Sequence, residues 1–127
     1  MDQSREEREW RAVLVRRYLG RLVTVTVDRP LGSTHPEHPE IYYPINYGYI
    51  PGELAPDGEY LDAYVLGVNE PLESFSGQVI AIIHRADDVE DKLVVAPEGT
   101  SFTPEEIAEA VAFHEKYYQT RIEMWRG

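Results

Sequence analysis

Three carboxylates lie within six residues around one glycine, in the stretch Pro56-Asp57-Gly58-Glu59-Tyr60-Leu61-Asp62. Carboxylates this close repel one another unless a cation neutralises them or some of them bind protons. Mg²⁺ prefers oxygen ligands and keeps several of its waters, so a few carboxylates at a turn and the following strand would suit it. The stretch therefore predicts a divalent-metal site. Because Pro-Asp-Gly is also a common turn signal, a simple turn is the alternative.

A second acidic cluster, Asp87-Asp88-Val89-Glu90-Asp91, follows an apolar run and ends at Lys92. It is not a helical calcium loop, because Val89 stands at the third position and Lys92 where the turn glycine belongs. An acidic hairpin tip that is merely solvated is the alternative. Two acidic clusters, each beside an expected strand end, favour a shared metal site.

Four tyrosines lie between Ile41 and Ile50, around Pro44, Asn46 and Gly48. In an extended chain, Tyr43, Tyr47 and Tyr49 would share one face and Tyr42 and Asn46 the other. Such a row usually packs in a core. At the mouth of a cleft, however, tyrosine hydroxyls donate to phosphate oxygens without adding charge.

The preceding loop contains His35-Pro36-Glu37-His38. Two histidines and a carboxylate are possible ligands of a transition metal, but no regular element frames them. An exposed proline-rich loop is the preferred interpretation.

Composition narrows the classes of protein that fit. The chain has 127 residues and no cysteine, which predicts one domain over 1–127 without disulfides. The net charge is -11, and beyond Arg21 there are 19 acidic residues against six basic ones. Such a surface repels nucleic acid and attracts cations. No apolar run is long enough to span a membrane and the N-terminus lacks a targeting pattern, so we expect a cytoplasmic protein with neither nucleic-acid nor membrane partners.

The expected elements are a helix at each end with short strands between them. Residues 1–20 are expected to form a helical extension, with the helix over Ser4–Leu19. Its apolar stripe (Trp10, Val13, Leu14, Tyr18) would cover the core or contact a second subunit in a homo-oligomer. Thr103 begins the second helix with a capping box, and the helix should reach Tyr117 or Tyr118. Strands are expected at Leu22–Val27, Leu61–Val68, Gln78–Arg85 and Leu93–Ala96, with a last one at Arg121–Trp125. This order favours an α+β fold with a small five-stranded barrel of the oligonucleotide-binding (OB) type.

Two segments together resemble the family I soluble inorganic pyrophosphatases. They are Tyr43-Pro44-Ile45-Asn46-Tyr47-Gly48-Tyr49-Ile50 and Asp57-Gly58-Glu59-Tyr60-Leu61-Asp62, followed by the acidic stretch that ends in Lys92. The resemblance extends from about Val27 to Pro97. It implies hydrolysis of pyrophosphate by a metal-activated water, with Mg²⁺ as cofactor and Mn²⁺ as the alternative.

The resemblance also implies roles for individual residues. Asp57, Asp62, Asp87 and Asp91 would be metal ligands, with Glu90 as the alternative to Asp91. Glu59 stands where the family has an aspartate that activates the attacking water. Phosphate would be bound by Arg29, Lys92, Tyr43, Tyr47 and Tyr117, and catalysis is assigned to Glu59, Asp62, Arg29, Lys92 and Tyr47.

The chain departs from the family in two places. An arginine-rich helix precedes Leu22 where the family has a β-hairpin with site residues, and Tyr118 stands where the family has a lysine. These departures support an alternative function, a metal-dependent binder or hydrolase of another small phosphate compound. An oligonucleotide-binding barrel is a third possibility, although its strands would carry basic residues between the aromatic ones.

Overall fold

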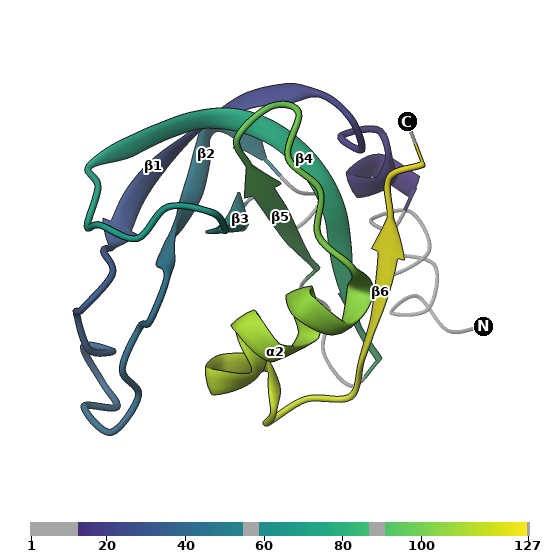
Figure 1. Cartoon of the computed structure of the whole chain (residues 1–127). Coiled ribbons are helices and arrows are strands. Elements are labelled where there is room, and N and C mark those ends of the chain that lie inside the picture. The colour runs from purple at the N-terminus through teal and green to yellow at the C-terminus, as the bar shows by residue number, and fades with distance from the viewer. Residues whose placement is uncertain (1–12, 55–58, 87–90, 127) are drawn as a thin grey trace.

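The computed structural model describes residues 13–54, 59–86 and 91–126. Five strands close into a barrel: β1 (Leu22–Arg29), β2 (Asn46–Leu54), β3 (Tyr60–Val65), β5 (Lys92–Ala96) and β4 (Ser74–Arg85) (Figure 1). The ring closes because β1 pairs with both β2 and β4. A further strand, β6 (Thr120–Met124), pairs with β4 outside the ring. The predicted α+β fold with an OB-like five-stranded barrel is therefore confirmed.

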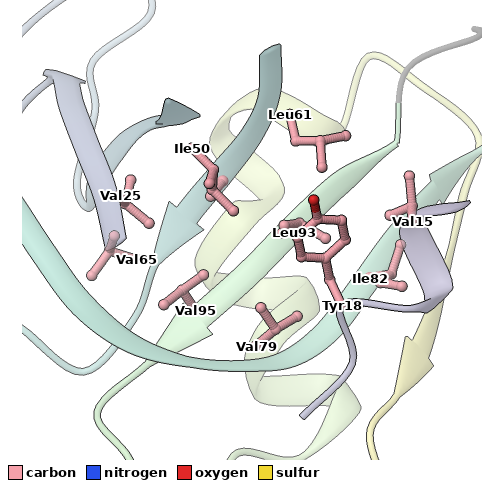
Figure 2. Packing of buried hydrophobic residues seen from close by; sticks show 11 residues of the cluster. Val15, Tyr18, Val25, Ile50, Leu61, Val65, Val79, Ile82, Leu93 and Val95 are labelled. Carbon is pink, nitrogen blue, oxygen red and sulfur yellow. The ribbon is translucent and has the colours of Figure 1, made fainter. Parts of the chain in front are cut away.

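The barrel interior is filled by apolar side chains from all five strands (Figure 2). Val15 and Tyr18, from the segment before β1, join this cluster and are almost fully buried. Residues 13–16 are helical, as expected, and the part of the predicted N-terminal helix before residue 13 lies outside the described residues. The helix ends before the predicted Leu19, because Arg17, Tyr18 and Leu19 form turns whose backbone N–H groups donate three residues back. The strand residues of the interior cluster are Val25, Ile50, Leu61, Ala63, Val65, Val79, Ile82, Leu93 and Val95.

A register shift between Val79 and Ala81 changes which side chains of β4 face the interior. A β-bulge places two residues opposite one, so the alternation of faces is reset beyond it. Val79 and Ile82 both belong to the interior cluster, whereas Ile83 belongs to the cluster on the other face. His84 consequently has the inward parity of Ile82.

The outer face of the sheet packs against α2 (Pro104–Glu115). Ile107 and Val111 of this helix are buried against strand residues that include Tyr47 and Tyr64. The helix begins as predicted: the Thr103 side chain accepts from the Glu106 backbone N–H, and the Glu106 side chain accepts from the Thr103 N–H.

The aromatic segment becomes a strand only at Asn46, and Tyr42 forms an isolated bridge with Thr34. Pro44 has no N–H to donate, which explains why the ladder starts after it. Gly48 lies where β2 crosses close to β1, because a Cβ there would be 1.9 Å from the Thr26 carbonyl oxygen. Within the part of the chain that the structure describes, no helix is long and apolar enough to cross a membrane.

Candidate active site

Asp62, Lys92 and Tyr47 meet on the outer face of the barrel, on three adjacent strands. The parallel register of β3 and β5 pairs Asp62 with Lys92. Lys92 Nζ donates to Asp62 Oδ2 at 2.6 Å and to the Tyr47 hydroxyl oxygen at 3.0 Å. The Lys92 side chain is 3% exposed and that of Asp62 is 30% exposed, so solvent reaches the carboxylate but hardly the ammonium. A carboxylate, a cation and a phenol thus share one small region.

Arg29 and Tyr43 form a pair beside the group of Asp62, Lys92 and Tyr47. Arg29 ends β1, and its Nη1 donates to the Tyr43 hydroxyl at 2.9 Å. The ring centroids of Tyr43 and Tyr47 are 5.8 Å apart, so this pair lies beside the group around Lys92. All five residues named so far were predicted as site residues from the sequence, and the fold brings them together.

The electrostatics of the site follow from burial and neighbouring charge. Burial raises the pKa of Tyr47, against the opposing effect of Lys92, so this phenol remains protonated and can donate a hydrogen bond. Burial also raises the pKa of Asp28, against the lowering effect of the Arg29 charge, and the nearby charge of Asp62 adds a smaller increase. Two carboxylates close enough to interact are what a divalent cation would relieve.

Asn46 connects the loops around the site. Its Oδ1 accepts from the backbone N–H groups of Leu31 and Leu72, at 2.9 Å and 3.1 Å, and its Nδ2 donates to the Glu70 carbonyl at 2.9 Å. The residue is fully buried. It therefore holds the loop after Arg29 against the loop before β4.

A buried polar network lies behind the tyrosines. Arg85 donates to both carboxylate oxygens of Glu115, at 3.0 Å and 2.6 Å. Tyr64 donates to Glu115 Oε2 at 2.5 Å, and His114 Nδ1 lies 2.9 Å from the Tyr64 oxygen. The Arg85 guanidinium also stacks 3.7 Å from the ring centroid of Tyr118.

The proton count of this network sets the tautomer of His114. Tyr64 has one hydroxyl proton and gives it to the carboxylate, so its oxygen must accept from His114 Nδ1–H. Burial and the positive charge of Arg85 lower the pKa of His114 to about 4, which leaves the imidazole neutral near pH 7. Nε2 then carries a lone pair. The His114 ring contacts Tyr47 edge-on, at 6.0 Å between centroids.

The remaining predicted site residues do not all join the cluster. Asp91 bonds His84 through Oδ2 at 2.9 Å, on the inner side of the sheet. Tyr117 is 57% exposed, and the described residues show it in contact with Lys116 rather than with the site. Glu59 is exposed directly before β3. Asp57, Asp87 and the alternative ligand Glu90 lie outside the described residues.

Sequence reasoning missed Asp28, Tyr64, His84, Arg85 and Glu115. Glu115 had a usable signal, since it lies four residues after Val111 and eight after Ile107, on the same face of a helix. His84 and Arg85 continue a buried apolar run, where charged groups normally require partners.

The donor chemistry on the outer face fits Mg²⁺ as far as it is described. Asp62 supplies carboxylate oxygens, which this ion prefers, and Asp28 adds negative charge nearby. Among the described residues, no three His, Cys, Asp or Glu side chains gather closely enough to hold an ion alone. That includes the loop of His35 and His38, the site of the transition-metal alternative.

Several known proteins are similar to this chain in sequence or in fold. A protein from Neisseria meningitidis named inorganic pyrophosphatase is 27% identical, over 84% of this chain and 80% of its own length. The crystal structure of the Ehrlichia chaffeensis inorganic pyrophosphatase superposes with a TM-score of 0.64 at 16% identity, covering 84% of this chain and 88% of that one. The Neisseria gonorrhoeae inorganic pyrophosphatase has a TM-score of 0.59 at 22% identity, covering 77% and 74%. These two likenesses establish the fold.

The family model described as inorganic pyrophosphatase matches residues 21–125, which is most of the chain. The match includes all six described strands and α2, and therefore every strand that carries a residue of the cluster around Lys92. The chain therefore belongs to the inorganic pyrophosphatase family of enzymes.

Proposed function

We propose that this protein hydrolyses inorganic pyrophosphate to two phosphates with Mg²⁺ as the required ion and Mn²⁺ as a possible substitute. The observation that carries the proposal is the convergence of Lys92 on Asp62 and Tyr47, with Arg29 and Tyr43 beside them. It supports a site that offers a carboxylate to a metal and cations with phenols to a phosphate. Family membership and the names of the relatives agree with this substrate.

The chain's own residues would act mainly by position and charge, because phosphoryl transfer requires little covalent chemistry from the protein. Lys92 and Arg29 neutralise the charge that accumulates on the phosphate oxygens. Tyr47 accepts from Lys92 and keeps its own proton, which it shares with Asp62 here and would donate to the departing phosphate once a metal ion engages that carboxylate. Tyr43 holds the Arg29 guanidinium in place.

Bound Mg²⁺ would lower the pKa of a water and polarise the phosphate oxygens. Asp62 would hold it together with Asp57 and Asp87, which remain predicted ligands, whereas the predicted ligand Asp91 contacts His84 on the inner side of the sheet. Glu59 would take the proton that the attacking water loses as the new P–O bond forms. The bridging P–O bond then breaks, and its electron pair leaves with the second phosphate.

Phosphate release from pyrophosphate, measured with and without Mg²⁺, tests the proposal. We expect turnover that depends on Mg²⁺ and is lost in Asp62→Asn. The control variant His38→Ala, which changes an exposed histidine outside the site, should retain turnover. A wild-type protein without turnover at saturating Mg²⁺ or Mn²⁺ would reject it. A nucleic-acid mobility assay in parallel checks the oligonucleotide-binding alternative, for which we expect no shift.

A second candidate function is binding or hydrolysis of another small phosphate compound. It is favoured by Tyr118, which stands where the family resemblance places a lysine and stacks on the buried Arg85. A panel of small phosphate esters and anhydrides assayed beside pyrophosphate separates the two functions. Homo-oligomeric assembly and a cytoplasmic location remain predictions.

A further inference from the structure

Four polar side chains form a chain of contacts that connects the N-terminal helical segment with the start of β5. Arg16 Nε donates to both carboxylate oxygens of Glu123, at 3.1 Å and 2.9 Å. Glu123 Oε1 lies 2.9 Å from His84 Nε2, and His84 Nδ1 lies 2.9 Å from Asp91 Oδ2. The two nitrogens of one imidazole therefore join two segments that are distant in sequence.

The central part of this chain is buried. His84 is 7% exposed, and the Asp91 side chain is 10% exposed. Polar groups at such positions are stabilised only by their partners, so the loss of either contact leaves a buried group unsatisfied. The outer contact is weaker, because the Arg16 side chain is 50% exposed and that of Glu123 is 24% exposed.

The strand register connects this chain of contacts to the candidate active site. In the β4–β5 ladder, Ile83 pairs with Lys92 and Ile82 with Leu93, so His84 comes next to Asp91. Successive residues of an extended chain point to opposite faces. When His84 holds Asp91 on the inner side, the next side chain, Lys92, must point outward to Asp62 and Tyr47.

We propose that His84 is a positioning residue with two separable contacts. Through Nδ1 it holds Asp91, and this fixes the outward direction of Lys92. Through Nε2 it holds Glu123, which with Arg16 fastens the N-terminal helical segment over the end of the barrel. Asp91 therefore acts by fixing the start of β5 against β4.

Two substitutions separate the contacts. The side-chain nitrogen of asparagine lies as many bonds from Cα as Nδ1 of histidine, and that of glutamine lies near the position of Nε2. His84→Asn therefore keeps a donor for Asp91 and loses the one for Glu123. His84→Gln does the reverse. The matched control for both is His38→Ala, which changes an exposed histidine.

The first readout is the ammonium ¹⁵N resonance of Lys92. The chain has two lysines, Lys92 and Lys116, so the exposed Lys116 is an internal reference. We expect the Lys92 resonance to keep its wild-type position in His84→Asn and to shift or broaden away in His84→Gln. If the proposed function holds, His84→Gln also raises the KM for pyrophosphate about 10-fold or more, because small misplacements of a binding group are costly.

The second readout is the rate of trypsin cleavage after Arg16 and Arg17, which reports release of the N-terminal segment. His84→Asn should be cleaved roughly 5-fold faster than the wild type, the scale of a lost contact of about 1 kcal/mol. His84→Gln should be cleaved at the wild-type rate. Glu123→Ala and Asp91→Ser address the same two contacts from the partner side if a His84 variant does not fold.

The inference is overturned if the two His84 variants change both readouts alike, or if neither changes. Neither the Lys92 resonance nor the rate of trypsin cleavage depends on catalysis. A wild-type protein that fails to hydrolyse pyrophosphate would reject the proposed function, whereas the lysine resonance and the trypsin rates would still decide whether His84 acts through two separate contacts.

Discussion

Lys92 Nζ lies 2.6 Å from Asp62 Oδ2, so an ammonium group already occupies one oxygen of the carboxylate that we expect to bind metal. The two residues are 30 positions apart in sequence and meet through the parallel pairing of β3 and β5. Lysine and a divalent ion would thus share one carboxylate. Binding of the metal and binding of the phosphate are therefore linked through Asp62.

Lys92→Met tests this link. The substitution keeps the buried stem but removes the charge, so Mn²⁺ affinity measured by calorimetry should stay equal or increase, because a competing cation is gone. The kcat/KM for pyrophosphate should fall about 10²-fold or more, the usual cost of a lost donor to developing charge. Lys116→Met, at an exposed position, is the control. A kcat/KM close to that of the wild type would show that Lys92 does not contact the substrate.

Asp62→Asn and Asp91→Asn should affect metal binding differently. Asp62 lies on the outer face, whereas Asp91 faces His84 on the inner side. We expect Asp62→Asn to weaken Mn²⁺ affinity by about 10-fold or more. Asp91→Asn retains an oxygen for His84 and should leave the affinity within about 3-fold of the wild type. Equal losses in the two variants would identify Asp91 as a ligand.

The role of Glu59 can be separated from metal binding. If Glu59 takes the proton of the attacking water, Glu59→Gln should lower turnover by ~10²- to 10⁴-fold at saturating Mg²⁺, with metal affinity nearly intact. Glu59→Asp restores the family's usual residue and should retain activity. Full activity of Glu59→Gln would require another base or activation of the water by the metals alone.

Much of the fold could be predicted because its signals are local. The capping box at Thr103 and the alternation of β-branched residues after Leu22 each lie within a few residues. The bulge between Val79 and Ala81 left no comparable signal, because it depends on how β4 pairs with β5. Its effect on the faces of β4 explains why His84 and Arg85 were not predicted as partners of other elements.

The site could be predicted only where a motif carried it. Arg29, Tyr43, Tyr47, Asp62 and Lys92 were predicted and lie together. The direction of the Asp91 side chain was not predictable. A shift of one residue in strand register decides whether a side chain lies on the outer or the inner face of the sheet. The Tyr64 and Glu115 contact joins residues 51 positions apart and has no motif in the sequence.

The buried ion pair of Arg85 and Glu115 should be costly to break from one side. Their side chains are 2% and 4% exposed. Glu115→Leu leaves a buried guanidinium without its main partner and should lower the free energy of unfolding by about 3–5 kcal/mol. Arg85→Met combined with Glu115→Leu removes both charges and should cost less than the sum of the single changes. Urea unfolding of the four proteins gives the coupling, and strictly additive losses would contradict it.

The pH dependence of stability should reveal His114. Its pKa is lowered to about 4 from an ordinary value of 6.5, first by burial and then by the charge of Arg85. Between these two values the unfolded chain binds a proton at this residue and the folded chain does not. The contribution of neutral His114 to stability is therefore fully present above pH 6.5, and it is lost as the pH falls toward 4.

His114→Asn is the matched variant, because its amide nitrogen can still donate to the Tyr64 oxygen but does not titrate in this range. We expect the melting temperature of the wild type to fall more steeply between pH 6.5 and 4.5 than that of His114→Asn. The lowered pKa values of Glu115 and Glu123 place their own effects below 4.5. A ¹⁵N spectrum of the imidazole at pH 7 should show a proton on Nδ1 and a bare Nε2. A protonated Nε2, or an imidazole that titrates near pH 6.5, would contradict the hydrogen-bond order from Glu115 through Tyr64 to His114.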